Sequence, residues 1–191
     1  VWDYELEIMI FLALPLVVGG VILAEKLMYS FYPLEFAPAV LAFQILIASA
    51  GIIFLYRPLN DVLIVLDQQK KTFWVAMAGA GVNVLLNLIL IPVYSLYGAA
   101  VATVATHVLV LCSMTFLVGK FTFIRLPFLR VFLTLCISAF AASAMYVGLR
   151  QPLTQNLHIF LLVPAAAAVY ALVFFALRKY VVIRYFKHAY V

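Results

Sequence analysis

Charged side chains are scarce in this sequence. They make up 10% of the 191 residues, whereas a soluble domain carries about 25%. Hydrophobic residues account for 69% of the chain, and the mean hydropathy is +1.21. A folded globule with so few charges would not stay dissolved in water. The composition therefore excludes a soluble domain and predicts an integral membrane protein.

Cysteine is also rare. The only two, Cys112 and Cys136, lie inside apolar runs and lack the paired spacing of a disulfide framework or a zinc site. We interpret them as small, unreactive residues of membrane helices, and we expect no metal site.

The sequence lacks the short motifs that hold nucleotides or catalytic groups. There is no Walker-type phosphate loop, no HExxH, no DxD and no Ser-His-Asp set. The connectors between apolar runs are too short for a catalytic domain outside the membrane. We therefore expect no enzymatic activity and no cofactor, and any use of ATP would require another chain.

Six continuous apolar runs are present, and a spanning helix needs about 20 such residues. Lipid offers no partner for exposed backbone groups, and the runs are too long and continuous for barrel strands. We predict an all-α, polytopic bundle of six transmembrane helices over residues 1–178, followed by a basic-aromatic cytoplasmic tail at 179–191. The predicted spans are 6–24, 38–66, 73–92, 97–119, 128–149 and 157–177.

Basic residues are distributed unevenly between the two sides of these spans. One side has two, Lys26 and Arg150. The other has nine: Lys70, Lys71, Lys120, Arg125, Arg130, Arg178, Lys179, Arg184 and Lys187. The positive-inside rule then predicts that both termini lie in the cytoplasm, in a multi-pass protein of the cytoplasmic membrane.

Aromatic and basic residues cluster together over 120–130 and 178–190. This mixture favours the headgroup layer, where anionic lipids attract it. We interpret both segments as anchors to membrane lipids rather than as nucleic-acid-binding elements. Before the first apolar run, Asp3, Glu5 and Glu7 have the wrong sign for a signal peptide. We expect the 191 residues to be part of a longer polypeptide.

The segment "LYRPLND" places charges within an apolar span. Arg57 and Asp61 are four residues apart and can pair along one helix face, with Asn60 beside them. Pro58 removes a backbone donor and can kink the helix. Arg57 either faces a polar cavity, where its planar fork suits a phosphate, or extends to the cytoplasmic surface while paired with Asp61. Both readings remain open from the sequence.

Asn83 and Asn87 share a face of the third span, where asparagines either join helices or line a polar cavity. The fourth span carries small residues at intervals of four, which indicates close helix packing. Two such series run side by side: Gly98, Ala102 and Thr106, and Ala99, Thr103 and His107. His107 lies near the middle of its span. There it would act either as a proton relay or as a group that forms an interhelical hydrogen bond.

The stretch "NVLLNLILIPVYSLYGAAVATVATHVLVL" resembles the signature of the oligosaccharide/polysaccharide flippases of the multidrug/oligosaccharidyl-lipid/polysaccharide exporter superfamily. "LALPLVVGGVILAEKLMYSFYPLEFAPAVLAFQIL" is similar to the beginning of that family's second half, and "NDVLIVLDQQKKTF" resembles its next cytoplasmic connector. The resemblance covers about residues 6–120.

This resemblance implies that the chain is the C-terminal lobe of a MATE-like transporter with two six-helix lobes. Such a transporter moves undecaprenyl-diphosphate-linked oligosaccharides across the membrane by alternating access, for assembly of O-antigen, capsule or exopolysaccharide. The N-terminal lobe would be its partner.

If the resemblance holds, residues already described would form the transport site. Arg57, Asn60, Asn83 and Asn87 would contact the substrate. Asp61 and His107 would couple transport to an ion. The alternatives are a drug/cation antiporter of the same superfamily, a lipid II-type flippase, a membrane-embedded transferase and a purely structural subunit.

Overall fold

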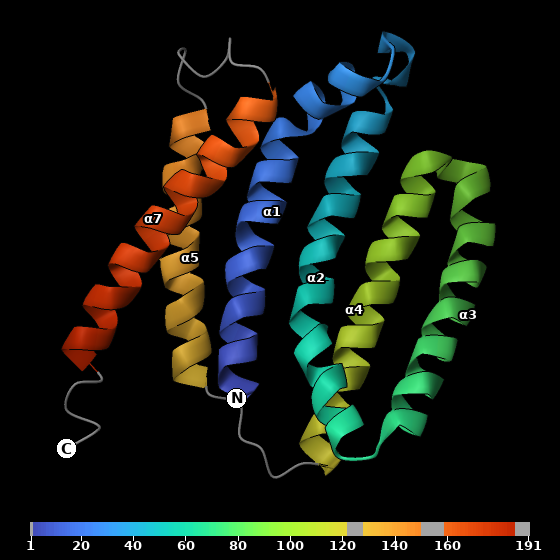
Figure 1. Ribbon diagram of the computed structural model, residues 1–191. Helices are drawn as coiled ribbons and strands as arrows, with labels where there is room; N and C mark the ends of the chain where they lie inside the picture. The colour runs from blue at the N-terminus through green and yellow to red at the C-terminus, as the bar shows by residue number, and fades with distance from the viewer. Residues whose placement is uncertain (1, 122–127, 150–158, 186–191) are drawn as a thin grey trace.

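The computed structural model describes residues 2–121, 128–149 and 159–185. These residues form six long helices and one 3-10 turn, without a strand among them (Figure 1). The elements are α1 (Trp2–Phe31), η1 (Leu34–Phe36), α2 (Ala39–Val65), α3 (Gln69–Tyr94), α4 (Leu96–Phe121), α5 (Phe128–Leu149) and α7 (Ile159–Tyr185). Each of the six helices is long and apolar enough to cross a membrane, which confirms the predicted all-α, six-span protein.

Several helices extend beyond the predicted spans, and four of them contain an internal proline. Pro15, Pro58, Pro92 and Pro164 are all within helices. The prediction that the third span ends at Pro92 was wrong, since α3 continues to Tyr94. Likewise α7 continues into the predicted tail as far as Tyr185. Residues 186–191 of that tail, Arg125 and Arg150 lie outside the described residues.

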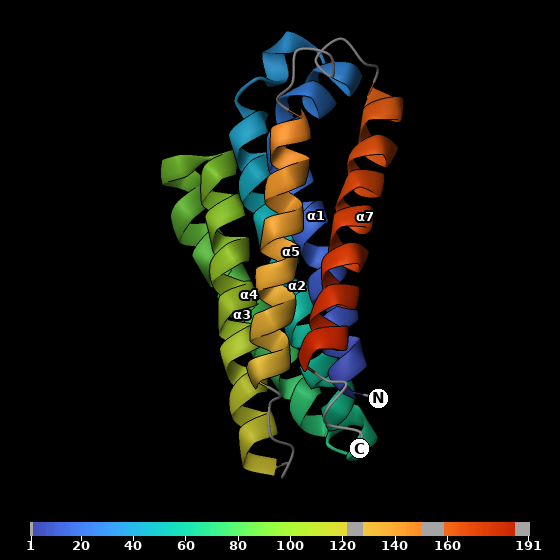
Figure 2. The same ribbon diagram turned by 90° about the vertical axis from the view of Figure 1, so that its left-hand side faces the viewer.

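The helices follow a spatial order different from their order in the chain. From one edge to the other they run α3, α4, α2 and α1, after which α5 and α7 pack against each other and against α1 (Figures 1 and 2). Helix α3 packs almost entirely against α4. Helix α1 is therefore the central element, which joins the α2–α4 side of the molecule to the α5–α7 side.

Glycines allow the closest helix contacts. A Cβ atom on Gly20 would lie 2.5 Å from Ile47 Cγ1, and one on Gly51 would lie 2.9 Å from Val17 Cγ2, so α1 and α2 interlock. Gly79 of α3 is similarly close to α4. In lipid, where no hydrophobic force draws helices together, this small-residue packing contributes much of the association.

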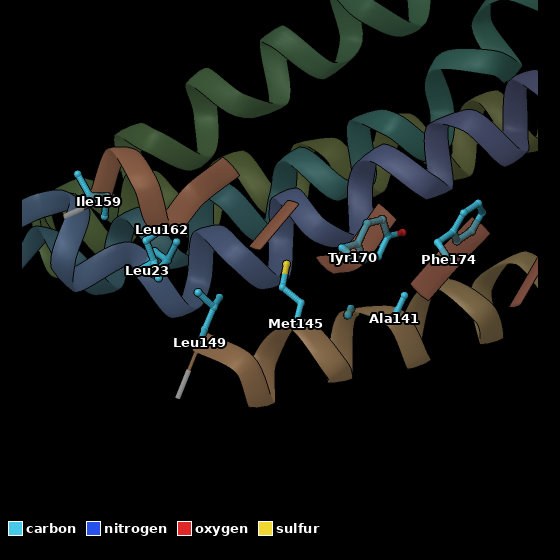
Figure 3. Packing of buried hydrophobic residues seen from close by; sticks show 9 residues of the cluster. Leu23, Ala141, Met145, Leu149, Ile159, Leu162, Tyr170 and Phe174 are labelled. Atoms are coloured by element: carbon cyan, nitrogen blue, oxygen red, sulfur yellow. The ribbon is translucent and has the colours of Figure 1, made fainter. Parts of the chain in front are cut away.

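Two apolar clusters lie on either side of α1. The first joins α1, α5 and α7, and Figure 3 shows how Tyr170 and Phe174 of α7 lie above Ala141 of α5. Its buried members are Leu23, Ala141, Ala142, Met145, Leu149, Ile159, Leu162, Tyr170 and Phe174. The second joins α2 and α4 through Leu59, Leu63, Val110, Met114 and Val118.

The two ends of the bundle differ in charge. The beginnings of α1, α3 and α5 and the ends of α2, α4 and α7 lie at one end, which we call the charged end (Figure 1). There Lys71 Nζ lies 3.1 Å from the centroid of the Phe121 ring, and Lys120 Nζ lies 5.5 Å from the same centroid. The η1 turn and the α3–α4 connection lie at the opposite end (Figure 1).

Candidate functional site

Arg57 and Asp61 form an ion pair on α2, near the charged end. Arg57 Nε lies 3.2 Å from Asp61 Oδ2, with one helical turn between the two residues. Asn60 Nδ2 donates to the other carboxylate oxygen, Asp61 Oδ1, at 3.3 Å. The Arg57 side chain is 63% exposed and that of Asp61 is 34% exposed, so water, lipid or a partner reaches this pair. The next residue in α2, Pro58, is buried.

A second carboxyl group, which the sequence reading did not assign to the site, faces this pair. Glu5 of α1 lies close enough to Asp61 and to Arg57 to interact electrostatically with both. The site therefore extends across the α1–α2 boundary and contains an acidic pair beside one guanidinium group.

A further ion pair connects the other side of α1 to α7. Glu7 Oε2 accepts a hydrogen bond from Arg178 Nη2 at 2.6 Å. The sequence reading counted both residues only for their charge. Because Glu5 faces α2 and Glu7 faces α7, the first turns of α1 have polar contacts on both flanks at the charged end.

Asn83 and Asn87 of α3 form a hydrogen-bonded chain that reaches α4. Asn87 Nδ2 donates to Asn83 Oδ1 at 2.9 Å, and Asn83 Nδ2 donates to Thr106 Oγ1 at 3.1 Å. The Thr106 hydroxyl in turn donates to the Ala102 carbonyl oxygen at 2.8 Å. Asn83 thus joins the two helices, and the Oδ1 atom of Asn87 is buried without a hydrogen-bonding partner.

His107 of α4 lies beside Tyr56 of α2. Its ring centroid lies 6.3 Å from that of Tyr56, and its Nδ1 atom is buried without a hydrogen-bonding partner. No carboxylate contacts it among the described residues. His107 and Asp61, the two residues predicted to couple an ion, are therefore not in contact.

The predicted site residues fall into two groups. His107 and Tyr56, each adjacent in sequence to a member of one group, lie between them. One group is the amide chain from Asn87 to Thr106, and the other contains Arg57, Asn60 and Asp61. His107 follows Thr106 in the chain and faces Tyr56, which precedes Arg57. Adjacent helical residues point about 100° apart, so this line of polar groups from α3 to α1 is interrupted at both steps.

Comparisons with known proteins give one distant relative. An uncharacterized membrane protein of Methanocaldococcus jannaschii is 28% identical to this chain over 110 residues. The aligned segment covers 58% of this chain and 25% of that protein, so the chain matches a small part of a longer membrane protein. No family model matches the sequence, and no solved structure matches it. The similarity and the six spans together indicate a multi-pass membrane protein.

Proposed function

We propose that this chain is one lobe of a flippase that moves a lipid-linked oligosaccharide across the cytoplasmic membrane. A second, N-terminal lobe would complete the passage, and the two would alternate between inward-open and outward-open arrangements. The charged end would face the cytoplasm, where nine predicted basic residues gather. The cargo would be an isoprenoid diphosphate that carries a sugar chain.

The observation that carries this proposal is the geometry of Arg57. Asp61 pairs with its Nε atom, and among the described residues no hydrogen bond or ion pair engages the two terminal nitrogens of the guanidinium. Those nitrogens form the planar fork that binds phosphate oxygens in pairs. A diphosphate needs such a cation, because an unpaired charge is costly in a low-dielectric region.

The amide chain supports the carbohydrate part of the proposal. Asn87 Oδ1 and His107 Nδ1 are buried and have no partner, and an unpaired polar atom in hydrocarbon is costly. Sugar hydroxyl groups or water in a transport passage would satisfy both atoms. Asn83 donates to Thr106 and accepts a hydrogen bond from Asn87, so Asn83 would position Asn87.

The test replaces Arg57 in the full-length protein, in a strain that depends on it for surface polysaccharide. Arg57→Ala should abolish the polymer and cause lipid-linked oligosaccharide to accumulate, with protein abundance unchanged. Arg57→Lys should restore transport only partly, because an ammonium group cannot bind two oxygens in one plane. Lys70→Ala, which removes an exposed positive charge at the same end, is the control. Normal polymer in the Arg57→Ala strain would exclude Arg57 from the cargo site.

The acidic pair favours one second candidate, a drug/cation antiporter. Glu5 and Asp61 are neighbouring carboxyl groups within spanning helices, and such a pair can exchange a proton for a cationic drug. Arg57 beside them is unfavourable for a cationic cargo. Loss of drug resistance in a Glu5→Gln strain with normal surface polysaccharide would support the antiporter instead.

A further inference from the structure

An apolar groove of about 370 Å³ lies along the second half of α1, toward the end of the bundle opposite the charged end. The proposed function does not use this groove. Its floor is α1, where Gly19 leaves a hollow. One wall comes from α2 and the other from α5 and α7. The lining residues are Pro15, Leu16, Gly19, Gly20, Leu23, Leu27, Phe43, Ile47, Met145, Val163, Ala166 and Ala167.

The arrangement of the helices explains why the groove exists. Helices α2 and α7 each pack against α1, and neither packs extensively against the other. The small side chains of Ala166 and Ala167 leave the space between them open. An unfilled hollow of this kind loses dispersion contacts along its whole lining, so a ligand that fills it gains them.

The length and lining of the groove identify its occupant. From Pro15 to Leu27, twelve residues of helix rise about 18 Å, and one leaflet of the hydrocarbon core is about 15 Å thick. All the lining side chains are apolar, so the groove offers nothing to a sugar or a diphosphate. Leu16 and Val163 at its rim are exposed, which makes the groove continuous with the apolar surface that the spans present to lipid.

We propose that this groove binds one acyl chain of a membrane phospholipid, from the leaflet at the opposite end of the bundle. The inference requires the chain to be embedded in a membrane and does not depend on the proposed cargo. A bound chain would bridge α2 and α7 and would stiffen the α5–α7 side against α1.

The test fills the groove and measures the bound lipid. Gly19→Leu places a side chain in the hollow, where a Cβ atom would meet only Met145 Cε at 3.6 Å, an ordinary contact. Gly81→Leu is the matched control, since a Cβ atom there has no neighbour within 4 Å and the residue also lies inside a helix. Ala167→Leu, at an exposed position on α7, is a second filling variant.

The full-length protein and its variants are purified in mild detergent and examined by native mass spectrometry. We expect one phospholipid to remain on the unaltered protein and on Gly81→Leu. Its bound fraction should fall about tenfold or more in both filling variants. In vesicles that contain phosphatidylglycerol with a mid-chain diazirine, light should attach the lipid to Leu16, Leu23 or Met145.

Three results would overturn the proposal. The first is an equal bound fraction in Gly19→Leu, Ala167→Leu and Gly81→Leu. The second is a bound isoprenoid lipid, in place of a phospholipid, that is lost in both filling variants and retained in Gly81→Leu. The third is photolabelling that avoids the groove, which would mean that another segment of the protein occupies it. None of these results depends on whether the protein transports an oligosaccharide.

Discussion

Glu7 and Arg178 face each other across the boundary between α1 and α7, with 2.6 Å between Glu7 Oε2 and Arg178 Nη2, although 171 residues separate them in the chain. The Glu7 side chain is 14% exposed and that of Arg178 is 37% exposed. The contact joins the first helix to the last described helix at the charged end of the bundle. It is therefore the natural place to test whether α7 packs on α1 in the membrane.

Glu7→Gln should weaken this packing. The substitution leaves the guanidinium without its counter-charge, and we expect a loss of about 1–2 kcal/mol because the pair is partly exposed. The measurement is the thermal unfolding midpoint in detergent. Glu25→Gln, an exposed carboxylate on the same helix, is the control and should have no effect. A double variant with Arg178→Gln should lose less than the sum of the single variants; full additivity would show that the pair contributes no coupling.

The turn between α3 and α4 makes Ser95 a site where glycine should stabilise the protein. Ser95 has φ 51° and ψ −129°, and its N–H donates to the Ile91 carbonyl oxygen at 2.8 Å. Glycine adopts a positive φ without a steric cost, so Ser95→Gly should raise stability by about 1 kcal/mol. Ser95→Ala retains the Cβ atom and should not. Equal midpoints for the two variants would mean that the backbone relaxes at this turn.

Gly98 and Gly119 lie on the same helix and should respond in opposite directions to alanine. A Cβ atom on Gly98 would overlap the carbonyl oxygen of Leu90, whereas one on Gly119 meets nothing within 4 Å. Gly98→Ala should separate α3 from α4 and lower the unfolding midpoint. Gly119→Ala should gain up to about 1 kcal/mol from helix propensity. If both variants were stabilised, the close approach of the two helices would be wrong.

Removing the central amide of the Asn87–Asn83–Thr106 chain should cost more than removing its end. Asn83→Ala leaves two groups without their partner, while Asn87→Ala leaves one. Each interhelical hydrogen bond in a membrane contributes about 0.6–2 kcal/mol, so the difference should fall in that range. Unfolding midpoints of the two variants and of Asn83→Ala/Thr106→Val provide the comparison. A larger loss for Asn87→Ala would indicate that Asn87 has contacts beyond this chain.

The spans were predictable because lipid leaves the backbone few choices, and a long apolar run must then become a helix. Helix ends were harder, since Pro92 is accommodated inside α3 and does not end it. The Arg57–Asp61 pair is local to one helix, so its spacing alone suggests it. The contacts of Glu5 and Glu7 reach other helices, and no local pattern specifies which ones.

The hydrogen bond between Asn83 and Thr106 could have been predicted if the length of the turn between their helices had been known. Both residues are evident in the sequence, but as features of separate helices. They lie twelve residues before and eleven residues after Ser95, on the two arms of a hairpin whose turn is that single residue. With the turn known, the pairing of the arms follows. The prediction of a longer connector, ending the third span at Pro92 and starting the fourth at 97, concealed it.

That single-residue turn also limits how the protein can move. One residue reaches at most about 3.6 Å, while packed helix axes lie about 8–10 Å apart, so α3 cannot part from α4 at this end. Any tilt of α4 therefore moves α3 with it, and the two helices tilt as one unit. Because α3 touches little else, it transmits such a tilt to the surrounding lipid rather than to the other helices.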